Sequence, residues 1–366
     1  MTLEGKRQES KCIATKFKQF LNLNIMKVED FSEFVKTAKK FRDKTLPILD
    51  EILFSGNIVR LSNLEQNIDL ETEENFGDGF TVPFAEFEKV VQKVKTGDIT
   101  ISPEDDLKVK VSTQKGVFTF VGQEPDDFPK HTSVSEMTHI TDLCLEEMEK
   151  IKKAEVFSAK DDLRPVMCSV LVDKDTIVGT DAHTLSFYPS AKERDSSFLI
   201  DNKIAKHISG LKREISVFEG GKDNNFIAFK VDNLSIVSRK IDGTFPNYKA
   251  VIPQANDKEM VLDSKNFLDA LDVAEISLPA SGLIVLEEKD GKISIRTEDL
   301  DFNKSFSCEL VGKGIGDSFK IGFKCQFMKN ILKTENSKST KITFSTPNRA
   351  MIINDHVLLM PLIIND

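Results

Sequence analysis

The amino-acid sequence repeats one plan three times, and internal repetition of this kind constrains a fold more than any single motif does. A proline that follows a bulky apolar residue occurs in "DDFPKH", "GTFPNY" and "LLMPLI". Pro129, Pro246 and Pro361 lie 117 and 115 residues apart. Strand-like runs that end in a polar break recur at nearly the same stride. The chain is therefore expected to contain three copies of one module.

Each copy is expected to contain two amphipathic helices, and each helix should follow a strand. In six windows, a run that suits a strand passes into apolar residues spaced three or four apart, which is the helical pattern. The windows are residues 20–41, 79–94, 138–157, 197–211, 258–277 and 318–332. Short strands fill the remainder of each copy. This pattern predicts the α+β class, with two helices packed against antiparallel sheets in every domain.

The length of 366 residues also favours several domains over one small core. Turn-forming residues such as Asp242-Gly243 and Pro253 mark residues 239–253 as the end of the second copy. The predicted organisation is an extension at residues 1–15 followed by domains at residues 16–131, 132–254 and 255–366.

Composition narrows the class of protein. No apolar run is long enough to span a bilayer, and the charged N-terminus lacks the apolar core of a secretion signal. The five cysteines are scattered without a C-x-x-C pair, which favours reduced thiols over disulfides or a structural zinc. We therefore expect a cytoplasmic protein with no membrane partner, no metal and no cofactor.

Charge is distributed unevenly along the sequence. The net charge of −9 argues against a surface coated in nucleic acid, because affinity for phosphate comes from Lys and Arg. Five of the six predicted helices nevertheless carry a lysine-rich polar face, whereas the first helix of the third copy is acidic. These faces are either ordinary solvated surfaces or parts of one basic surface, and both interpretations stay open at this point.

Three stretches resemble a known family. "RKIDGTFPNYKAVIP", at residues 239–253, is similar to the end of the second domain of bacterial replicative sliding clamps, the β subunit of DNA polymerase III. "LRPVMCSVLV" and "IVGTDAHTLSFY", within residues 163–188, resemble that domain's strand pair, and "VLLMPLIIND" resembles the family's C-terminal tail. The resemblance covers residues 16–366 and fits a bacterial or phage-encoded clamp.

The resemblance implies a ring of two identical chains joined head to tail, with helices inside and sheets outside. Twelve helices side by side at about 9 Å would enclose a bore of roughly 35 Å, which admits duplex DNA. Such a protein encircles double-stranded DNA and gives the DNA polymerase processivity without catalysing a reaction itself. The other implied partners are the clamp loader and repair proteins, which bind through short peptide motifs.

Candidate DNA-facing residues are basic side chains on or near the predicted helices. The resemblance points to Arg164, to Lys203 and to Arg42 and Lys44, which flank Asp43, and the lysine-rich helix faces supply the others. The full set is Arg42, Lys44, Arg164, Lys203, Lys206, Lys212, Arg213 and Lys329. Loose contacts from such side chains to phosphates would let a ring slide along DNA.

The resemblance also assigns an interface between the two chains. Phe118 and Phe120 match the edge strand of the first domain, and Ile276 lies on the facing helix of the third domain. The two phenylalanines would equally suit an ordinary sheet core, so both interpretations are kept.

An apolar pocket for partner peptides is implied between the link after the second domain and the C-terminal tail. Aliphatic and methionine-rich walls suit such a site because they repack at low cost. The implied residues are Met167, Thr180, His183, Leu185, Pro246, Val251, Leu358, Met360, Pro361 and Leu362. The family's Gly and Arg in the turn are Ala182 and Thr184 here, and Ile363 replaces an arginine. The location of the pocket is therefore better supported than its peptide preference.

Two other classes of protein stay open on the sequence alone. His183 beside Asp181 could suggest acid–base catalysis, but two residues at one turn also suit a pocket wall. "GKGIG", at residues 312–316, precedes a strand rather than a helix, so we interpret it as a hairpin turn and not as a phosphate-binding loop. The second alternative is a repeat adaptor that binds proteins but no DNA.

Overall fold

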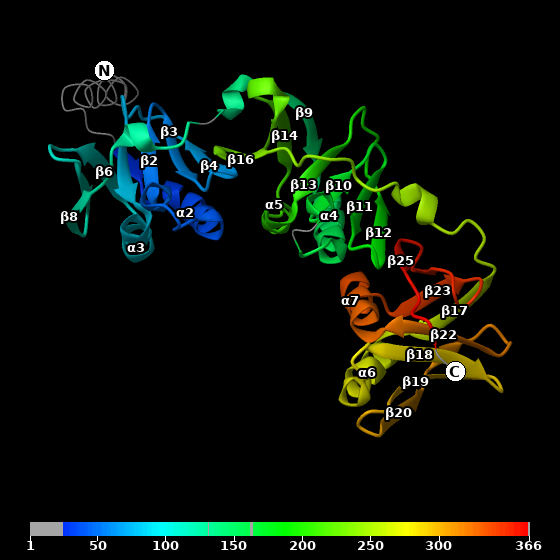
Figure 1. Cartoon of the computed structure of the whole chain (residues 1–366). Helices are drawn as coiled ribbons and strands as arrows, with labels where there is room; N and C mark the ends of the chain where they lie inside the picture. The colour runs from blue at the N-terminus through cyan, green and yellow to red at the C-terminus, as the bar shows by residue number, and fades with distance from the viewer. Residues whose placement is uncertain (1–24, 131, 162–163, 365–366) are drawn as a thin grey trace, which may run out of the picture. The chain divides into compact units, whose positions relative to one another are not determined.

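The computed structural model describes residues 25–130, 132–161 and 164–364, and Figure 1 labels their elements. The predicted extension at residues 1–15 lies outside this range. The described residues form six α-helices and four β-sheets, and the strands of each sheet pair in antiparallel fashion. The predicted α+β class is therefore confirmed.

Each of the six sequence windows contains a strand that leads into an α-helix, as the repeat predicts. The pairs are β1 (Ile25–Lys27) and α2 (Asp30–Phe41), β5 (Phe80–Pro83) and α3 (Phe84–Val94), β9 (Met137–Leu143) and α4 (Leu145–Phe157), β13 (Phe198–Asp201) and α5 (Asn202–Ile208), β17 (Lys258–Asp263) and α6 (Ser264–Ala274), and β22 (Phe319–Lys324) and α7 (Cys325–Glu335).

Helix α2 shows how the sequence produces these elements. Phe31, Phe34, Val35, Ala38 and Phe41 recur every three or four residues, so they share one face, and all five are buried. Acidic residues occupy the first turn and lysines the last, which complements the helix dipole. Full burial of one phenylalanine side chain stabilises a fold by roughly 1.5–3 kcal/mol, so this face accounts for the docking of α2.

The chain forms two compact units. Unit 1 holds the residues up to Leu143 together with Arg213–Lys240, and unit 2 holds Cys144–Lys212 together with the residues from Ile241 onward. Each unit contains one large and one small sheet. The large sheet of unit 1 joins strands of the first and second copies of the repeat, and the large sheet of unit 2 joins strands of the second and third. The division into three domains by sequence repeat stays a prediction.

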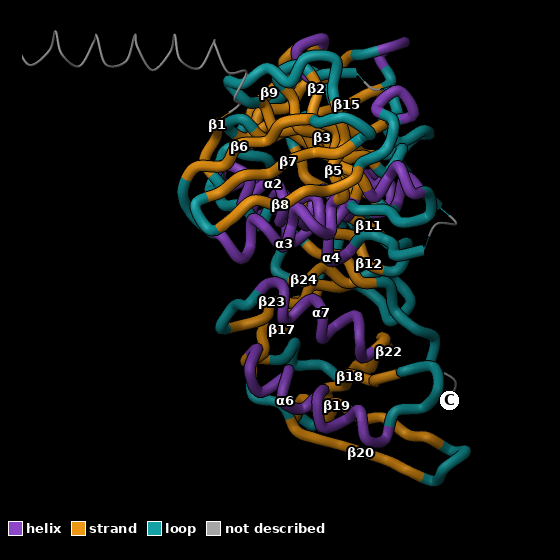
Figure 2. Tube along the Cα trace, turned by 90° about the vertical axis from the view of Figure 1, so that its left-hand side faces the viewer, coloured by secondary structure: helices purple, strands orange, loops and turns teal. Residues whose placement is uncertain are grey.

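Unit 1 contains an eight-stranded and a four-stranded sheet. The order of the larger sheet is β5, β2 (Glu51–Ser55), β3 (Ile58–Ser62), β4 (Gln66–Glu71), β16 (Leu234–Arg239), β15 (Phe226–Val231), β14 (Ile215–Gly220) and β9. The order of the smaller sheet is β1, β6 (Asp98–Pro103), β7 (Lys108–Thr113) and β8 (Gly116–Val121). Figure 2 shows β6, β7 and β8 running alongside one another, and β8 is the edge strand.

Unit 2 contains a nine-stranded and a four-stranded sheet. The larger sheet has the order β13, β10 (Ser169–Val172), β11 (Thr176–Thr180), β12 (Thr184–Pro189), β25 (Val357–Leu359), β24 (Met351–Ile353), β23 (Ser339–Phe344), β17 and β21 (Gly312–Lys313). The smaller sheet has the order β20 (Lys304–Glu309), β19 (Lys292–Asp299), β18 (Leu283–Lys289) and β22, so β20 is its edge strand. Strands β12 and β25 bring Leu185 opposite Leu358.

The interpretation of residues 312–316 as a hairpin turn is wrong. Gly312 and Lys313 form β21, which pairs with Val261 and Leu262 of β17 at the edge of the nine-stranded sheet. The following amides of Ile315 and Gly316 donate hydrogen bonds to the buried Glu288 carboxylate at 2.7 and 3.1 Å. Gly312 therefore lies in a strand, and Gly316 lies in a loop whose amides bind a carboxylate.

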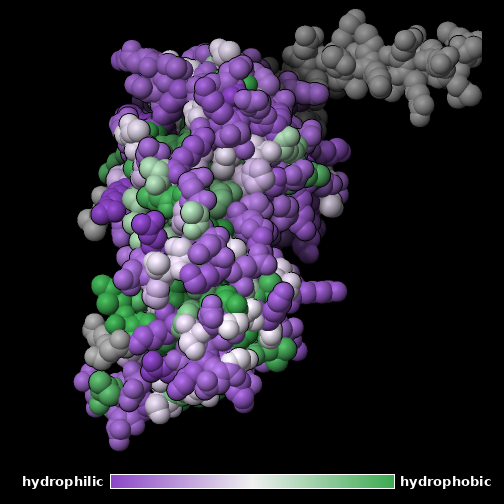
Figure 3. All heavy atoms as spheres, turned by 90° about the vertical axis from the view of Figure 1, so that its right-hand side faces the viewer, coloured by the Kyte–Doolittle hydropathy of each residue, from purple (hydrophilic) through white to green (hydrophobic). Residues whose placement is uncertain are grey.

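Ion pairs reduce the positive charge that the helix faces present. Lys39 contacts Glu88 at 2.7 Å, Lys150 contacts Glu146 at 2.5 Å, and Lys153 contacts Glu335 at 3.5 Å. Such partly exposed pairs add little to stability. They do, however, leave fewer free lysines than the sequence count suggested. The surface in Figure 3 is mainly hydrophilic, with hydrophobic residues gathered in patches.

Candidate functional site

A small, mainly apolar pocket of about 290 Å³ lies in unit 2. Three stretches far apart in sequence form its walls: residues 164–185, the link after residue 244, and the end of β25. The lining residues are Arg164, Met167, Thr180, Ala182, His183, Thr184, Leu185, Pro246, Asn247, Tyr248, Val251, Leu358 and Met360. Eight of the ten residues predicted for a peptide pocket are among them. Their role in peptide binding stays a prediction.

The other two predicted residues, Pro361 and Leu362, do not line this pocket. The amide of Leu362 donates a hydrogen bond to the carbonyl of Gly322 in β22 at 2.8 Å, so the tail adds to the edge of the four-stranded sheet. A Cβ at Gly322 would lie 2.7 Å from the carbonyl oxygen of Leu362, which explains the glycine there. The tail therefore leaves the pocket wall after Met360.

The turn between β11 and β12 is fixed by one carboxylate. Asp181 Oδ1 accepts hydrogen bonds from the amides of His183 and Thr184 at 2.9 and 2.6 Å, and from Thr184 Oγ1 at 2.9 Å. Between them Ala182 adopts a φ of 73°, in the left-handed region that favours glycine. Asp181 is thus occupied in holding a turn, which argues against the acid–base alternative for Asp181 and His183.

His183 joins the turn to the third copy of the repeat. Its imidazole stacks on the ring of Phe327 in α7, with ring centroids 5.5 Å apart. Its carbonyl accepts a hydrogen bond from the amide of Met360 at 3.0 Å. Phe327 was missed by the sequence analysis, because nothing in the spacing of α7 distinguishes it from a core position.

Tyr248 closes the pocket on the side of the link. Its side chain is buried against Leu185 and Leu358, and its hydroxyl donates a hydrogen bond to Asp173 Oδ2 at 2.8 Å. Burial opposes the charge of Asp173, but hydrogen bonds from Ser197, the amide of Lys174 and Tyr248 outweigh it and lower the pKa of Asp173. Burial is also the main reason why the pKa of Tyr248 is raised.

Arg164, which was predicted to face DNA, lines the apolar pocket, and its DNA-facing role stays a prediction. Its side chain is exposed, and Nη1 lies 3.9 Å from the sulfur of Met167. The guanidinium is the one side chain with a fixed positive charge among the residues that line the pocket. Arg164 lies three residues before Met167, a predicted pocket residue, and this spacing could have indicated that Arg164 lines the pocket.

Four of the predicted basic residues are exposed cations. Lys203 and Lys206 lie one helical turn apart on α5, and Lys44 and Lys212 lie in irregular loops. No ion pair joins any of these four lysines to a residue in the described ranges. They can therefore offer their full charge to an anionic partner.

The remaining three predicted basic residues are already paired. Arg42 makes a bidentate contact with Asp50, and its guanidinium lies over the ring of Phe84, 4.9 Å from the centroid. Arg213 contacts Glu33 and, at 2.7 Å, Asp232. The side chain of Lys329 is only 6% exposed and contacts two carboxylates of the α6 region. This pairing and low exposure argue against contact between Lys329 and DNA, and its DNA-facing role stays a prediction.

Strand β8 presents an open edge with apolar side chains. Phe118 and Phe120 are half-buried and stack with centroids 6.2 Å apart, against a shallow hollow of about 220 Å³ beside α3. Val117 and Val121, on the other face, are 60% and 61% exposed. The two phenylalanines are therefore not ordinary core residues. In unit 2, Ile276 is 73% exposed.

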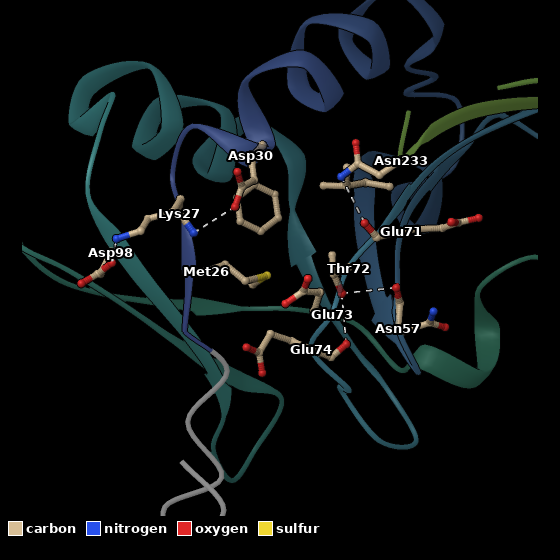
Figure 4. A pocket seen from close by; sticks show the side chains of 12 residues that line it. Met26, Lys27, Asp30, Asn57, Glu71, Thr72, Glu73, Glu74, Asp98 and Asn233 are labelled. Carbon is tan, nitrogen blue, oxygen red and sulfur yellow. Dashed lines mark hydrogen bonds and ion pairs between the residues drawn. The ribbon is translucent and has the colours of Figure 1, made fainter. Parts of the chain in front are cut away.

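A larger and more polar cavity of about 560 Å³ lies in unit 1, and Figure 4 shows its side chains. Lys27 pairs with Asp98, and its amide donates to Asp30 at 3.2 Å. Thr72 donates to the carbonyl of Glu74 at 3.0 Å. These groups satisfy one another, and no residue predicted for a site lies there. This cavity adds no candidate chemistry.

The parts of the chain that the structure describes contain no group of three or more His, Cys, Asp or Glu that could hold a metal ion. In the same parts, every helix is too short or too polar to cross a membrane.

Comparisons with known proteins agree with this architecture. The family described as "DNA polymerase III beta subunit, C-terminal domain" matches residues 249–357. The beta sliding clamp of Caulobacter vibrioides is 24% identical over 349 residues, which cover 88% of this chain and 94% of that protein. The beta sliding clamp of Bacillus subtilis is 22% identical over 346 residues, covering 86% and 91%.

Solved structures show the same fold. The DNA polymerase sliding clamp of Pseudomonas aeruginosa, crystallised with a ligand, matches with a TM-score of 0.82 and 19% identity. The match covers 93% of this chain and 99% of that one. The family match over residues 249–357, the relatives along most of the length and the shared fold together indicate a bacterial DNA polymerase III beta sliding clamp.

Proposed function

We propose that this protein is a DNA sliding clamp. Two copies close head to tail into a ring around double-stranded DNA, in the cytoplasm, and the ring tethers the replicative polymerase without catalysing a reaction. The apolar pocket receives short peptides from the polymerase, the clamp loader and repair proteins. The observation that carries the proposal is the likeness to sliding clamps along almost the entire chain, in sequence and in fold.

The two open sheet edges supply the means of closing a ring. β8 and β20 are both six-residue edge strands with the same alternation of exposed and half-buried residues. Such an edge presents unpaired amides and carbonyls, which a second strand can satisfy. Joining β8 of one copy to β20 of the other would use both of these edges.

Charges beside the two edges support this pairing. Lys89 and Lys93 of α3 flank Phe118 and Phe120. In unit 2, the exposed Asp269 on α6 precedes the exposed Ile276, whereas the neighbouring Asp272 is already paired with Lys329. Opposite charge near a shared apolar contact favours association between unlike edges and disfavours pairing of two β8 edges.

The exposed lysines suit a ring that slides. Lys203 and Lys206 can contact phosphates without reading bases, and contacts of this kind position DNA but carry no sequence information. An acidic remainder, with a net charge of −9, discourages DNA from binding elsewhere on the surface.

Native mass spectrometry of the full chain tests the ring. The expected species is a dimer, and Val117→Lys together with Phe120→Lys should convert it to monomer, because two buried ammonium groups oppose the interface. The matched control is Val156→Lys together with Leu64→Lys, at exposed apolar positions away from either edge strand. A wild-type monomer, or a dimer that survives the paired β8 substitutions, would contradict the proposal.

A further inference from the structure

The link at residues 241–253 forms one wall of the apolar pocket but has little regular structure of its own. A single 3-10 turn, η6 (Tyr248–Val251), interrupts it. Its main-chain hydrogen bonds are internal, from Tyr248 to Pro246 at 2.7 Å and from Ala250 to Asn247 at 3.3 Å. Within the described ranges, no main-chain hydrogen bond ties the link to the nine-stranded sheet. Side chains must therefore fix this wall.

Tyr248 is the one buried residue of the link. It is 7% exposed, whereas Pro246, Asn247 and Val251, which form the wall beside it, are all exposed. Phe245 and Ile252, which border the wall, also pack partly buried against the same apolar cluster, so Tyr248 is the most deeply buried of three side chains that hold the wall. Its ring packs in the apolar cluster of the nine-stranded sheet, and apolar packing of this kind is not directional.

Asp173 provides the directional contact. It lies in the turn between β10 and β11, and it accepts the Tyr248 hydroxyl at 2.8 Å. Ser197 Oγ donates to its other oxygen at 2.6 Å, and its own amide donates to the carbonyl of Thr176 at 2.8 Å. The acceptor is therefore held rigidly by the sheet. Lys249 also approaches Asp173, at 3.5 Å, but it is 59% exposed and contributes little.

We propose that Asp173 is a positioning residue for the apolar pocket: its carboxylate holds the Tyr248 hydroxyl, and Tyr248 in turn sets the wall formed by Pro246 and Val251. This inference rests on the proposed function of the pocket. A hydrogen bond from a phenol to a carboxylate is charge-assisted and directional. A wall ordered before binding favours affinity, because the entropy of ordering it is not lost during association.

The test compares two tyrosines that share the same chemistry. Tyr248→Phe removes the hydroxyl and keeps the ring. Tyr188→Phe is the matched control, because Tyr188 is 3% exposed and donates to the Glu335 carboxylate at 2.7 Å, yet does not line the pocket. The probe is a fluorescein-labelled pentapeptide with leucine and phenylalanine side chains, and fluorescence anisotropy gives its affinity.

The expected result is about tenfold weaker probe binding for Tyr248→Phe and unchanged binding for Tyr188→Phe, a difference that corresponds to about 1.4 kcal/mol. Asp173→Ala should weaken binding to the same extent, and the double variant Tyr248→Phe/Asp173→Ala no further, because one interaction is lost in all three. Both tyrosine variants should lose some thermal stability, so stability alone does not separate them.

A spectroscopic signature separates positioning from general destabilisation. The chain has two tyrosines and no tryptophan, so Tyr188→Phe leaves Tyr248 as the only phenol. Ultraviolet titration of that variant should show the raised pKa of Tyr248, which burial and Asp173 both favour. Adding Asp173→Ala should lower this pKa. An unchanged titration would mean that the two groups do not interact in solution.

Wild-type affinity in Tyr248→Phe, or an equal loss in Tyr188→Phe, would overturn the positioning role and leave the proposed pocket intact. Failure of the wild-type protein to bind the probe would contradict the pocket itself, and the positioning role with it.

Discussion

The ammonium group of Lys329 lies 2.6 Å from Asp272 Oδ1 and 2.5 Å from Glu275 Oε1, which places a cation of α7 between two carboxylates of the α6 region. Hydrogen bonds from Lys329 lower the pKa of Asp272. We expect Lys329→Met to leave DNA affinity unchanged, because the ammonium is buried and unavailable to phosphates.

The same substitution should lower the free energy of unfolding by about 1 kcal/mol, since the two carboxylates lose their counter-ion but remain nearly half exposed. Urea denaturation and a duplex-binding assay on the same variant measure both quantities. Weaker DNA binding at unchanged stability would show that Lys329 reaches the DNA.

Lys203 and Lys206 should behave in the opposite way. Replacing both with Gln is expected to reduce the slope of log affinity for duplex DNA against log salt concentration by about 1 per lysine. Unfolding should be unaffected, because both side chains are exposed and make no ion pair with a described residue. Lys329→Met is the matched control. An unchanged salt slope in the double variant would remove α5 from the DNA-facing surface.

Glu51 should make stability depend on pH near neutrality. It is 5% exposed, one carboxylate oxygen has no hydrogen-bond partner among the described residues, and the other accepts a long bond from Gln123 at 3.5 Å. Burial, with a smaller effect of Asp50 and Glu86, raises the pKa of Glu51 from 4.5 to about 7.

A raised pKa means that the folded state holds this proton more tightly than the unfolded state does. The contribution of Glu51 to the free energy of unfolding is on the order of 3 kcal/mol; it is complete below pH 4.5 and is lost as the pH rises through about 7. Glu51→Gln should flatten this part of the stability profile, measured by urea denaturation from pH 5 to 8 relative to wild type. Parallel profiles for the two proteins would show that Glu51 ionises normally.

The turn at Ala182 should tolerate glycine better than alanine. A left-handed alanine costs roughly 1–2 kcal/mol, and the greater freedom of glycine in the unfolded chain offsets part of the relief. We expect Ala182→Gly to raise the free energy of unfolding by roughly 0.5–1 kcal/mol. Ala270→Gly, within α6, is the matched control and should lower it by about 1 kcal/mol. If both substitutions lower the free energy of unfolding, Ala182 does not hold a strained left-handed conformation in solution.

Much of the fold was readable because periodicity is local. The spacing of Phe31, Phe34 and Phe41 predicted α2, and the same reasoning placed the other five helices. Which sheet edges join was not readable, because the pairing of Leu70 with Leu234, or of Leu185 with Leu358, depends on contacts between residues far apart in sequence. The sequence repeat does not indicate which strands pair across the boundary between two copies.

The pocket was predicted through the family resemblance. Where the structure departs from the predicted sites, the cause is a contact that the resemblance did not specify. Arg164 was assigned only to the DNA-facing set, because its place on the pocket wall depends on the turn around Met167. The tail residue Leu362 leaves the pocket because Gly322 offers it a main-chain partner. Lys329 appeared free because its carboxylates lie more than fifty positions away in the sequence. Tyr248 and Asp173 were missed for the same reason.

The most direct measurement for the proposed function is retention on DNA of different topology. The labelled protein is loaded onto nicked circular plasmid by the clamp loader of its source organism with ATP, and half of the sample is then linearised with a restriction enzyme. A ring held by topology should stay on the circle in high salt and be lost from the linear molecule. Equal retention on both forms, or on neither, would contradict the account.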